Sequence, residues 1–251
     1  MLNEKSTYAE LVTGFRWDLP DRFNIGEAVC SAWARRVPDQ VAIIEHMDDG
    51  PSRRTTYGEL EAMANRIANL LASQGVGTGD GVALLLPQCR ETAAAHVAIY
   101  KMGAIAVPLA MLFGVEALQY RLQNSGAKAL LMSHASRDNV AEVRQSLDAL
   151  SAVFCIDGKL DFAPHLHDAS TGMPDTFDAV DSKPDDPCLM IYTSGTTGPP
   201  KGALHGHRVL LGHLPGVQFA HEFLPQPGDL MWTPSDWAWA GGLLNALLPA
   251  L

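Results

Sequence analysis

Ile191-Tyr192-Thr193-Ser194-Gly195-Thr196-Thr197-Gly198-Pro199-Pro200-Lys201-Gly202 is the stretch on which the interpretation of this chain depends. It continues an apolar run that begins at residue 188 after a turn-forming Pro-Asp-Asp-Pro, so the run is predicted to be a buried strand. The glycines allow positive φ and close approach of a ligand. Backbone N–H groups in such turns converge on anions, the hydroxyls add donors, and Lys201 adds a positive charge. The stretch therefore predicts a loop that binds a triphosphate.

The spacing differs from that of the ordinary P-loop, Gly-x-x-x-x-Gly-Lys-Ser/Thr. The run instead resembles the phosphate-binding signature of the adenylate-forming enzymes, which include acyl-CoA synthetases, firefly luciferase and peptide-synthetase adenylation domains. The resemblance implies that ATP phosphates are bound by Thr193, Ser194, Gly195, Thr196, Thr197, Gly198 and Lys201, and that the Thr193 hydroxyl lies near Mg²⁺. The alternative is a Gly/Thr/Pro-rich surface loop with a solvated lysine.

The composition limits the classes of function. The chain has 251 residues, of which 47% are hydrophobic, so it is predicted to be globular with a sizeable core. Its net charge of −10 argues against a broad nucleic-acid or anionic-membrane surface. Four scattered cysteines without a Cys-x-x-Cys pair predict reduced core thiols. With neither a signal-peptide core nor an apolar run long enough for a membrane span, the expected location is cytoplasmic.

Apolar strands alternate with helical segments from about residue 82 to residue 156, which predicts βαβ units. The fold class is therefore α/β, with a mostly parallel sheet covered by helices on both faces. Residues 1–22 are predicted to be an extension whose Phe15 and Trp17 dock on the body. By resemblance, residues 23–251 form the N-terminal portion of an adenylation large domain that is incomplete at its C-terminal end.

Capping and turn residues in the sequence predict the positions of individual helices and strands. Asn24 with Glu27, and Thr56 with Glu59, predict capped helix starts. Residues 41–45 and 53–56 are predicted to form a hairpin. Helices are expected over residues 137–150, 208–223 and 239–248, and a strand over residues 229–233. Residues 157–187 are expected to be irregular, with room for a short helix.

A second informative run is Trp232-Thr233-Pro234-Ser235-Asp236-Trp237-Ala238-Trp239-Ala240-Gly241-Gly242. Asp236, Trp239 and Gly242 match an Asp…Gly-Trp…Gly run of acetyl- and medium-chain acyl-CoA synthetases, which implies an acyl pocket lined by Asp236, Trp237 and Trp239. Ala238 stands where those relatives often have glycine, and Trp237 adds bulk, so the pocket shape departs from theirs. The alternatives are ordinary core or interface tryptophans and a capping role for Asp236.

Histidines follow Lys201 at positions 205 and 207, with more at positions 213 and 221. A metal site is one interpretation, but it lacks a nearby acid or cysteine. A structural histidine that caps the following helix is favoured. The resemblance to acetyl-CoA synthetases extends to His205.

Residues 243–251 are hydrophobic to the last position. We interpret this apolar end as an unpartnered helix of a longer domain, the alternative being cover by a second copy in a homodimer. The resemblance implies an acyl-CoA synthetase that uses ATP, Mg²⁺, CoA and a small carboxylic acid. The family's adenine, ribose and C-terminal lysine motifs are not found, so no catalytic residue is assigned and the chain alone is expected to be inactive. The alternatives are a non-catalytic nucleotide-binding or pairing module and an amino-acid or luciferase-like adenylating enzyme.

Overall fold

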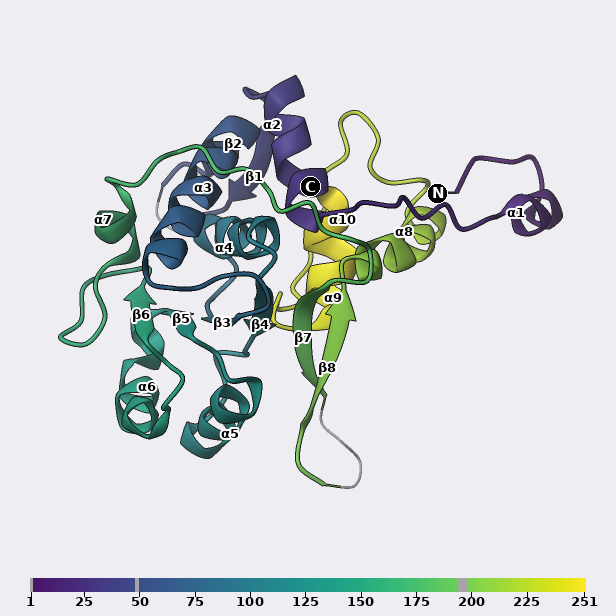
Figure 1. Ribbon diagram of the computed structural model, residues 1–251. Helices are drawn as coiled ribbons and strands as arrows, with labels where there is room; N and C mark the ends of the chain where they lie inside the picture. The colour runs from purple at the N-terminus through teal and green to yellow at the C-terminus, as the bar shows by residue number, and fades with distance from the viewer. Residues whose placement is uncertain (1, 48–49, 194–197) are drawn as a thin grey trace.

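The computed structural model describes residues 2–47, 50–193 and 198–251 (Figure 1). These residues form a six-stranded sheet in the order β6-β5-β3-β4-β7-β8, in which β3–β7 run parallel and β8 is antiparallel to β7. A separate antiparallel hairpin pairs β1 with β2, as predicted. The strands are β1 (Val41–Glu45), β2 (Arg53–Thr56), β3 (Gly81–Leu85), β4 (Ile105–Pro108), β5 (Ala129–Met132), β6 (Ala152–Cys155), β7 (Pro187–Thr193) and β8 (Lys201–Gly206).

Helices cover both faces of the sheet (Figure 1), which confirms the α/β prediction. The longer helices are α3 (Tyr57–Ser73), α4 (Arg90–Lys101), α5 (Val115–Ser125), α6 (Arg137–Val143) and α8 (Arg208–Ala220). Shorter segments are α1 (Tyr8–Gly14), α2 (Ala32–Arg36), α7 (Leu166–Ser170), α9 (Ala240–Gly242) and α10 (Leu248–Ala250). Single turns of π-helix, η1 (Glu27–Ser31) and η4 (Leu243–Leu247), and of 3₁₀-helix, η2 (His134–Ser136) and η3 (Arg144–Ser146), connect them.

Strand β3 contributes to two apolar cores because its side chains alternate between the faces of the sheet. Val82 and Leu84 belong to the larger core with α3 and α4, whereas Ala83 and Leu85 belong to the smaller core with α5 and α6. All four side chains are buried. This two-sided burial explains why the sequence of β3 is continuously apolar rather than alternating.

The predicted helix starts are confirmed. The Thr56 hydroxyl accepts a hydrogen bond from the Glu59 N–H (3.2 Å), and the Glu59 carboxylate accepts one from the Thr56 N–H (2.9 Å), which completes a capping box at α3. Asn24 accepts from the Glu27 N–H at 3.3 Å at the start of η1. All four cysteines are free thiols, as expected.

Three local predictions are wrong. The helix expected over residues 137–150 ends at Val143 and tightens into the 3₁₀ turn η3. Residues 229–233 form no strand: they lie between Pro227-Gly228 and Pro234, and Leu230 and Trp232 are 76% and 79% exposed. Trp17 does not dock on the body, because it is 58% exposed and packs edge-on against Phe15.

The apolar end of the chain is covered within the chain, so the expectation that it lacks a partner is wrong. Leu243, Leu244, Leu247 and Leu248 are buried in the larger core, and η4 and α10 pack against α8. Leu251 is 7% exposed, and its carbonyl accepts a hydrogen bond from the Tyr57 hydroxyl at 2.7 Å.

Candidate functional site

The carboxyl ends of β3 and β4 flank a point where the chain changes direction across the sheet. The connection after β3 leads into α4 on one face, and the connection after β4 leads into α5 on the opposite face. Open parallel sheets bind ligands outside the carboxyl ends of their strands at such switch points. The fold therefore places a candidate site at this edge of the sheet.

The tryptophan-rich run lies at this switch point. Gln88, which follows β3, donates a hydrogen bond from Nε2 to the Ser235 carbonyl at 2.6 Å. Phe113, which follows β4, packs edge-on against Trp239 with ring centroids 6.3 Å apart. These two contacts attach the run to the ends of both central strands.

The predicted substrate residues have different environments. Asp236 is half-buried, and its Oδ1 accepts a hydrogen bond from the Ala238 N–H at 2.9 Å, so it stabilises the turn of its own loop rather than a helix start. Trp237 is half-buried against the larger core, which favours the core-residue alternative for it. Trp239 is 46% exposed beside Phe113, so among the three it presents the most accessible apolar surface.

Residue 242 must be glycine because the backbone of Ser235 and Asp236 passes close to its Cα. A Cβ atom added there would lie 2.4 Å from the Asp236 carbonyl oxygen and 2.7 Å from that of Ser235. We expect Gly242→Ala to displace the 235–239 turn and to cost about 1–3 kcal/mol of stability, measured by urea unfolding and by near-ultraviolet circular dichroism of the tryptophans. Gly241→Ala is the matched control, because its nearest atom would be Ser235 Oγ at 3.9 Å. Equal effects of the two substitutions would contradict this account.

The phosphate-loop residues fall at the ends of β7 and β8. Thr193 and Lys201 are directly paired across the hairpin, and both side chains are exposed. Gly198 has φ of +136°, a conformation that favours glycine. The remaining predicted residues, Ser194, Gly195, Thr196 and Thr197, lie outside the described residues. The hairpin thus brings the strand-end hydroxyl and the lysine together, as a phosphate site requires.

Arg121 connects the two predicted parts of the site, and sequence reasoning missed it. Its guanidinium lies 4.0 Å from the centroid of Phe113 and 5.6 Å from that of Tyr192, the residue before Thr193. The side chain is 8% exposed, and no described residue accepts a hydrogen bond from its Nε. Burial lowers the pKa of Arg121. The series Trp239–Phe113–Arg121–Tyr192 therefore joins the aromatic run to the phosphate hairpin. The sequence signal that could have identified Arg121 is its position as an arginine on an otherwise apolar helix face.

One of the histidines that follow Lys201 has a structural role. Among the described residues, no group of three or more His, Cys, Asp or Glu side chains is placed to bind a metal ion. His207 is fully buried, and its Nδ1 accepts a hydrogen bond from the Ile25 N–H at 3.1 Å. His207 therefore has a structural role, which is the interpretation favoured from the sequence. It does not cap α8 as expected, because its side chain makes no capping hydrogen bond to that helix. Burial lowers the pKa of His207 to about 4 and also lowers the pKa of His205.

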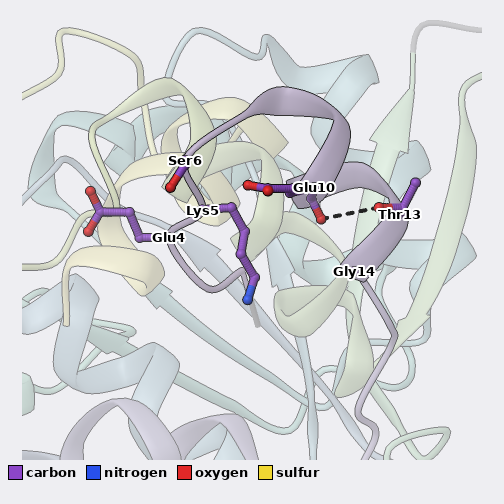
Figure 2. Close-up of a pocket in the computed structure, with 6 residues that line it drawn as sticks. All are labelled: Glu4, Lys5, Ser6, Glu10, Thr13 and Gly14. Atoms are coloured by element: carbon purple, nitrogen blue, oxygen red, sulfur yellow. Dashed lines mark hydrogen bonds between the residues drawn. The ribbon is translucent and has the colours of Figure 1, made fainter.

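A surface hollow of about 720 Å³ lies far along the chain from these residues (Figure 2). Its lining residues all come from the N-terminal segment around α1, in which no residue is buried. They are Glu4, Lys5, Ser6, Glu10, Thr13 and Gly14. A hollow formed by one exposed turn offers neither converging groups nor an apolar wall, so we assign it no function.

Comparison with known proteins identifies the family. The sequence profile of AMP-binding enzymes matches residues 30–251. The chain belongs to the AMP-binding enzyme family. This AMP-binding chain is 32% identical over 224 residues to an acetyl-coenzyme A synthetase of Xanthobacter autotrophicus, covering 81% of the chain and 34% of that relative. It is 31% identical to a 3-hydroxybenzoate–CoA ligase of Aromatoleum, covering 83% of the chain and 39% of that relative.

Solved structures support the same fold. An acyl-CoA synthetase of Brucella canis superposes with a TM-score of 0.80 and 26% identity, covering 97% of this AMP-binding chain and 44% of that protein. An anthranilate CoA ligase in complex with anthranoyl-AMP has a TM-score of 0.81 at 24% identity and shows the fold alone. The chain thus spans less than half the length of the relatives named here. Within the described residues, no helix is long and apolar enough to cross a membrane.

Proposed function

We propose that this AMP-binding chain provides the triphosphate site and part of the acid site of an acyl-CoA synthetase. The parent reaction activates a carboxylate with ATP to an acyl-adenylate and then transfers the acyl group to CoA. The observation that carries the proposal is the pairing of Thr193 with Lys201, linked through Arg121 to the aromatic run at the switch point. The proposed location of the reaction is the cytoplasm.

The residues of the hairpin fit the outer phosphates of ATP. A carboxylate and a triphosphate repel each other, so activation depends on neutralising charge and fixing geometry. The exposed Lys201 ammonium supplies positive charge in a chain of net charge −10, and the Thr193 hydroxyl lies on the paired strand. Mg²⁺ when bound supplies charge neutralisation between phosphate oxygens. We propose that the Thr193 hydroxyl would lie near the ion.

The acid is proposed to be a small monocarboxylate with an apolar or aromatic body. Trp239 and Phe113 form a rigid apolar wall at the switch point. The proposal draws on the names of two relatives, an acetyl-coenzyme A synthetase and a 3-hydroxybenzoate–CoA ligase, which include an aliphatic and an aromatic acyl group. We expect the 251-residue chain alone to form no measurable acyl-CoA.

Lys201→Ala is expected to weaken binding of Mg·ATP and of pyrophosphate to this chain by about 10- to 150-fold, because charged hydrogen bonds contribute about 1.5–3 kcal/mol. Isothermal titration calorimetry measures the change. Lys159→Ala is the matched control, since it removes the same charge from an exposed position after β6. If the wild-type chain binds neither ligand, or if the two variants lose equal affinity, the proposed phosphate site is wrong.

A further inference from the structure

The end of β7 and the start of β8, where Thr193 and Lys201 lie, continue beyond the point at which β7 pairs with β4 (Figure 1). Strand β7 is registered with its parallel neighbour β4 at Leu189, opposite Ala106. From Met190 to Thr193, the described ladder partners of β7 are residues of β8. The sheet therefore holds the base of the hairpin, whereas its far end has β8 as the described ladder partner of β7.

Helix α5 lies beside this far end and bonds to Tyr192 in β7 and to Pro200, the residue before β8. The Tyr120 hydroxyl donates to the carbonyl of Pro200, the residue before Lys201, at 2.9 Å. The Tyr192 hydroxyl donates to Asn124 Oδ1 at 2.7 Å, with the Arg121 carbonyl at 3.2 Å as a second acceptor. One turn of a helix thus attaches to the residues immediately before Thr193 and immediately before Lys201.

The tyrosine contacts between α5 and the hairpin combine hydrogen bonds with ring packing. Pro199 and Pro200 have no backbone N–H, so neither can donate a ladder bond to β7. The Tyr120 hydroxyl instead bonds the Pro200 carbonyl and so attaches this flank of the loop to α5. Tyr192 is 4% exposed, and burial raises its pKa further above its ordinary value. The rings of Tyr120 and Tyr192 pack edge-on with centroids 6.5 Å apart.

We propose that Tyr120, Asn124 and Tyr192 form a positioning clamp that holds the far end of the hairpin against α5 and so fixes Thr193 and Lys201 for phosphate binding. The inference deepens the proposed function and rests on it for the identity of the ligand, which is a polyphosphate. The clamp residues act through Thr193 and Lys201 and do not themselves touch the ligand.

The decisive variants remove single polar groups. Tyr120→Phe deletes the hydroxyl and keeps the ring, and Asn124→Ala deletes the acceptor of Tyr192. Tyr57→Phe is the matched control, because it deletes a tyrosine hydroxyl that bonds to the Leu251 carbonyl at 2.7 Å, away from the hairpin. Two quantities are measured on the 251-residue chain: hydrogen–deuterium exchange of peptides spanning residues 187–206, and calorimetric affinity for pyrophosphate.

We expect each clamp variant to exchange about 3- to 10-fold faster over residues 187–206 and to bind pyrophosphate about 3- to 10-fold more weakly, as loss of one hydrogen bond predicts. Exchange in β3 and β5 should stay at the wild-type rate, and Tyr57→Phe should leave the hairpin unchanged. Wild-type hairpin exchange in both clamp variants, or equal acceleration in Tyr57→Phe, would overturn the clamp. Absence of pyrophosphate binding by the wild-type chain would instead overturn the proposed function, and the exchange rates would still decide whether α5 fixes the hairpin.

Discussion

Glu61→Ala is expected to lower the free energy of unfolding by about 3–5 kcal/mol, because it leaves a buried ammonium without its counter-charge. The Lys101 side chain is 1% exposed, and its Nζ donates to the Glu61 carboxylate and to Asn65 Oδ1. Ser31 Oγ donates to the same carboxylate at 2.9 Å. Urea unfolding followed by circular dichroism measures the loss.

Two further variants test the cause. Asp175→Ala removes the exposed ion pair with Arg66, in which both side chains are more than a third exposed, and should cost at most about 1 kcal/mol. The double variant Glu61→Leu/Lys101→Met removes both charges and should recover much of the lost stability. If Glu61→Ala and Asp175→Ala are equally mild, the buried pair is not a major determinant of stability.

Acidification is expected to destabilise the fold by about 2–3 kcal/mol for each of two buried histidines between about pH 7 and about pH 4.5. Burial lowers the pKa of His96 to about 3 and that of His207 to about 4. The unfolded chain has the ordinary histidine pKa of about 6.5, so it binds protons first as the pH falls. The contribution of these two histidines to stability is therefore fully present above about pH 6.5 and is lost as the pH falls toward their folded-state pKa values. Urea midpoints across this range measure the decline.

His207→Asn separates titration from packing. An Asn side-chain oxygen can accept from the Ile25 N–H in place of Nδ1, but it does not titrate. The variant should show a flatter pH dependence, by up to about 1.4 kcal/mol per pH unit. His134→Asn is the control at an exposed histidine and should keep the wild-type slope. A wild-type slope in His207→Asn would contradict the assignment.

Much of the fold was predictable because its signals are local. Continuous apolar runs such as residues 82–86 predict strands buried on both faces, and the Thr56/Glu59 pair predicts a helix start. The pairing of Thr193 with Lys201 agrees with the sequence motif. Family resemblance was confirmed by the profile match over residues 30–251.

The failures arise where tertiary contacts override local pattern. Strand β8 was not predicted, because its glycines and histidines lack strand propensity and it is held by pairing with β7. Residues 229–233 have a strand-like composition but no neighbouring strand to pair with in the described chain. The clamp on α5 joins Tyr120 to Pro200, 80 positions later, and no local pattern reports such a contact.

The shared strand β3 has a consequence for how this protein tolerates change. Side chains at odd and even positions of β3 pack in different apolar cores, so substituting one of them disturbs one core and leaves the other intact. Inserting or deleting a single residue there would instead transpose every subsequent side chain to the wrong side at once. A substitution in β3 is therefore a local loss of packing in one core, whereas a change in spacing disrupts both cores together.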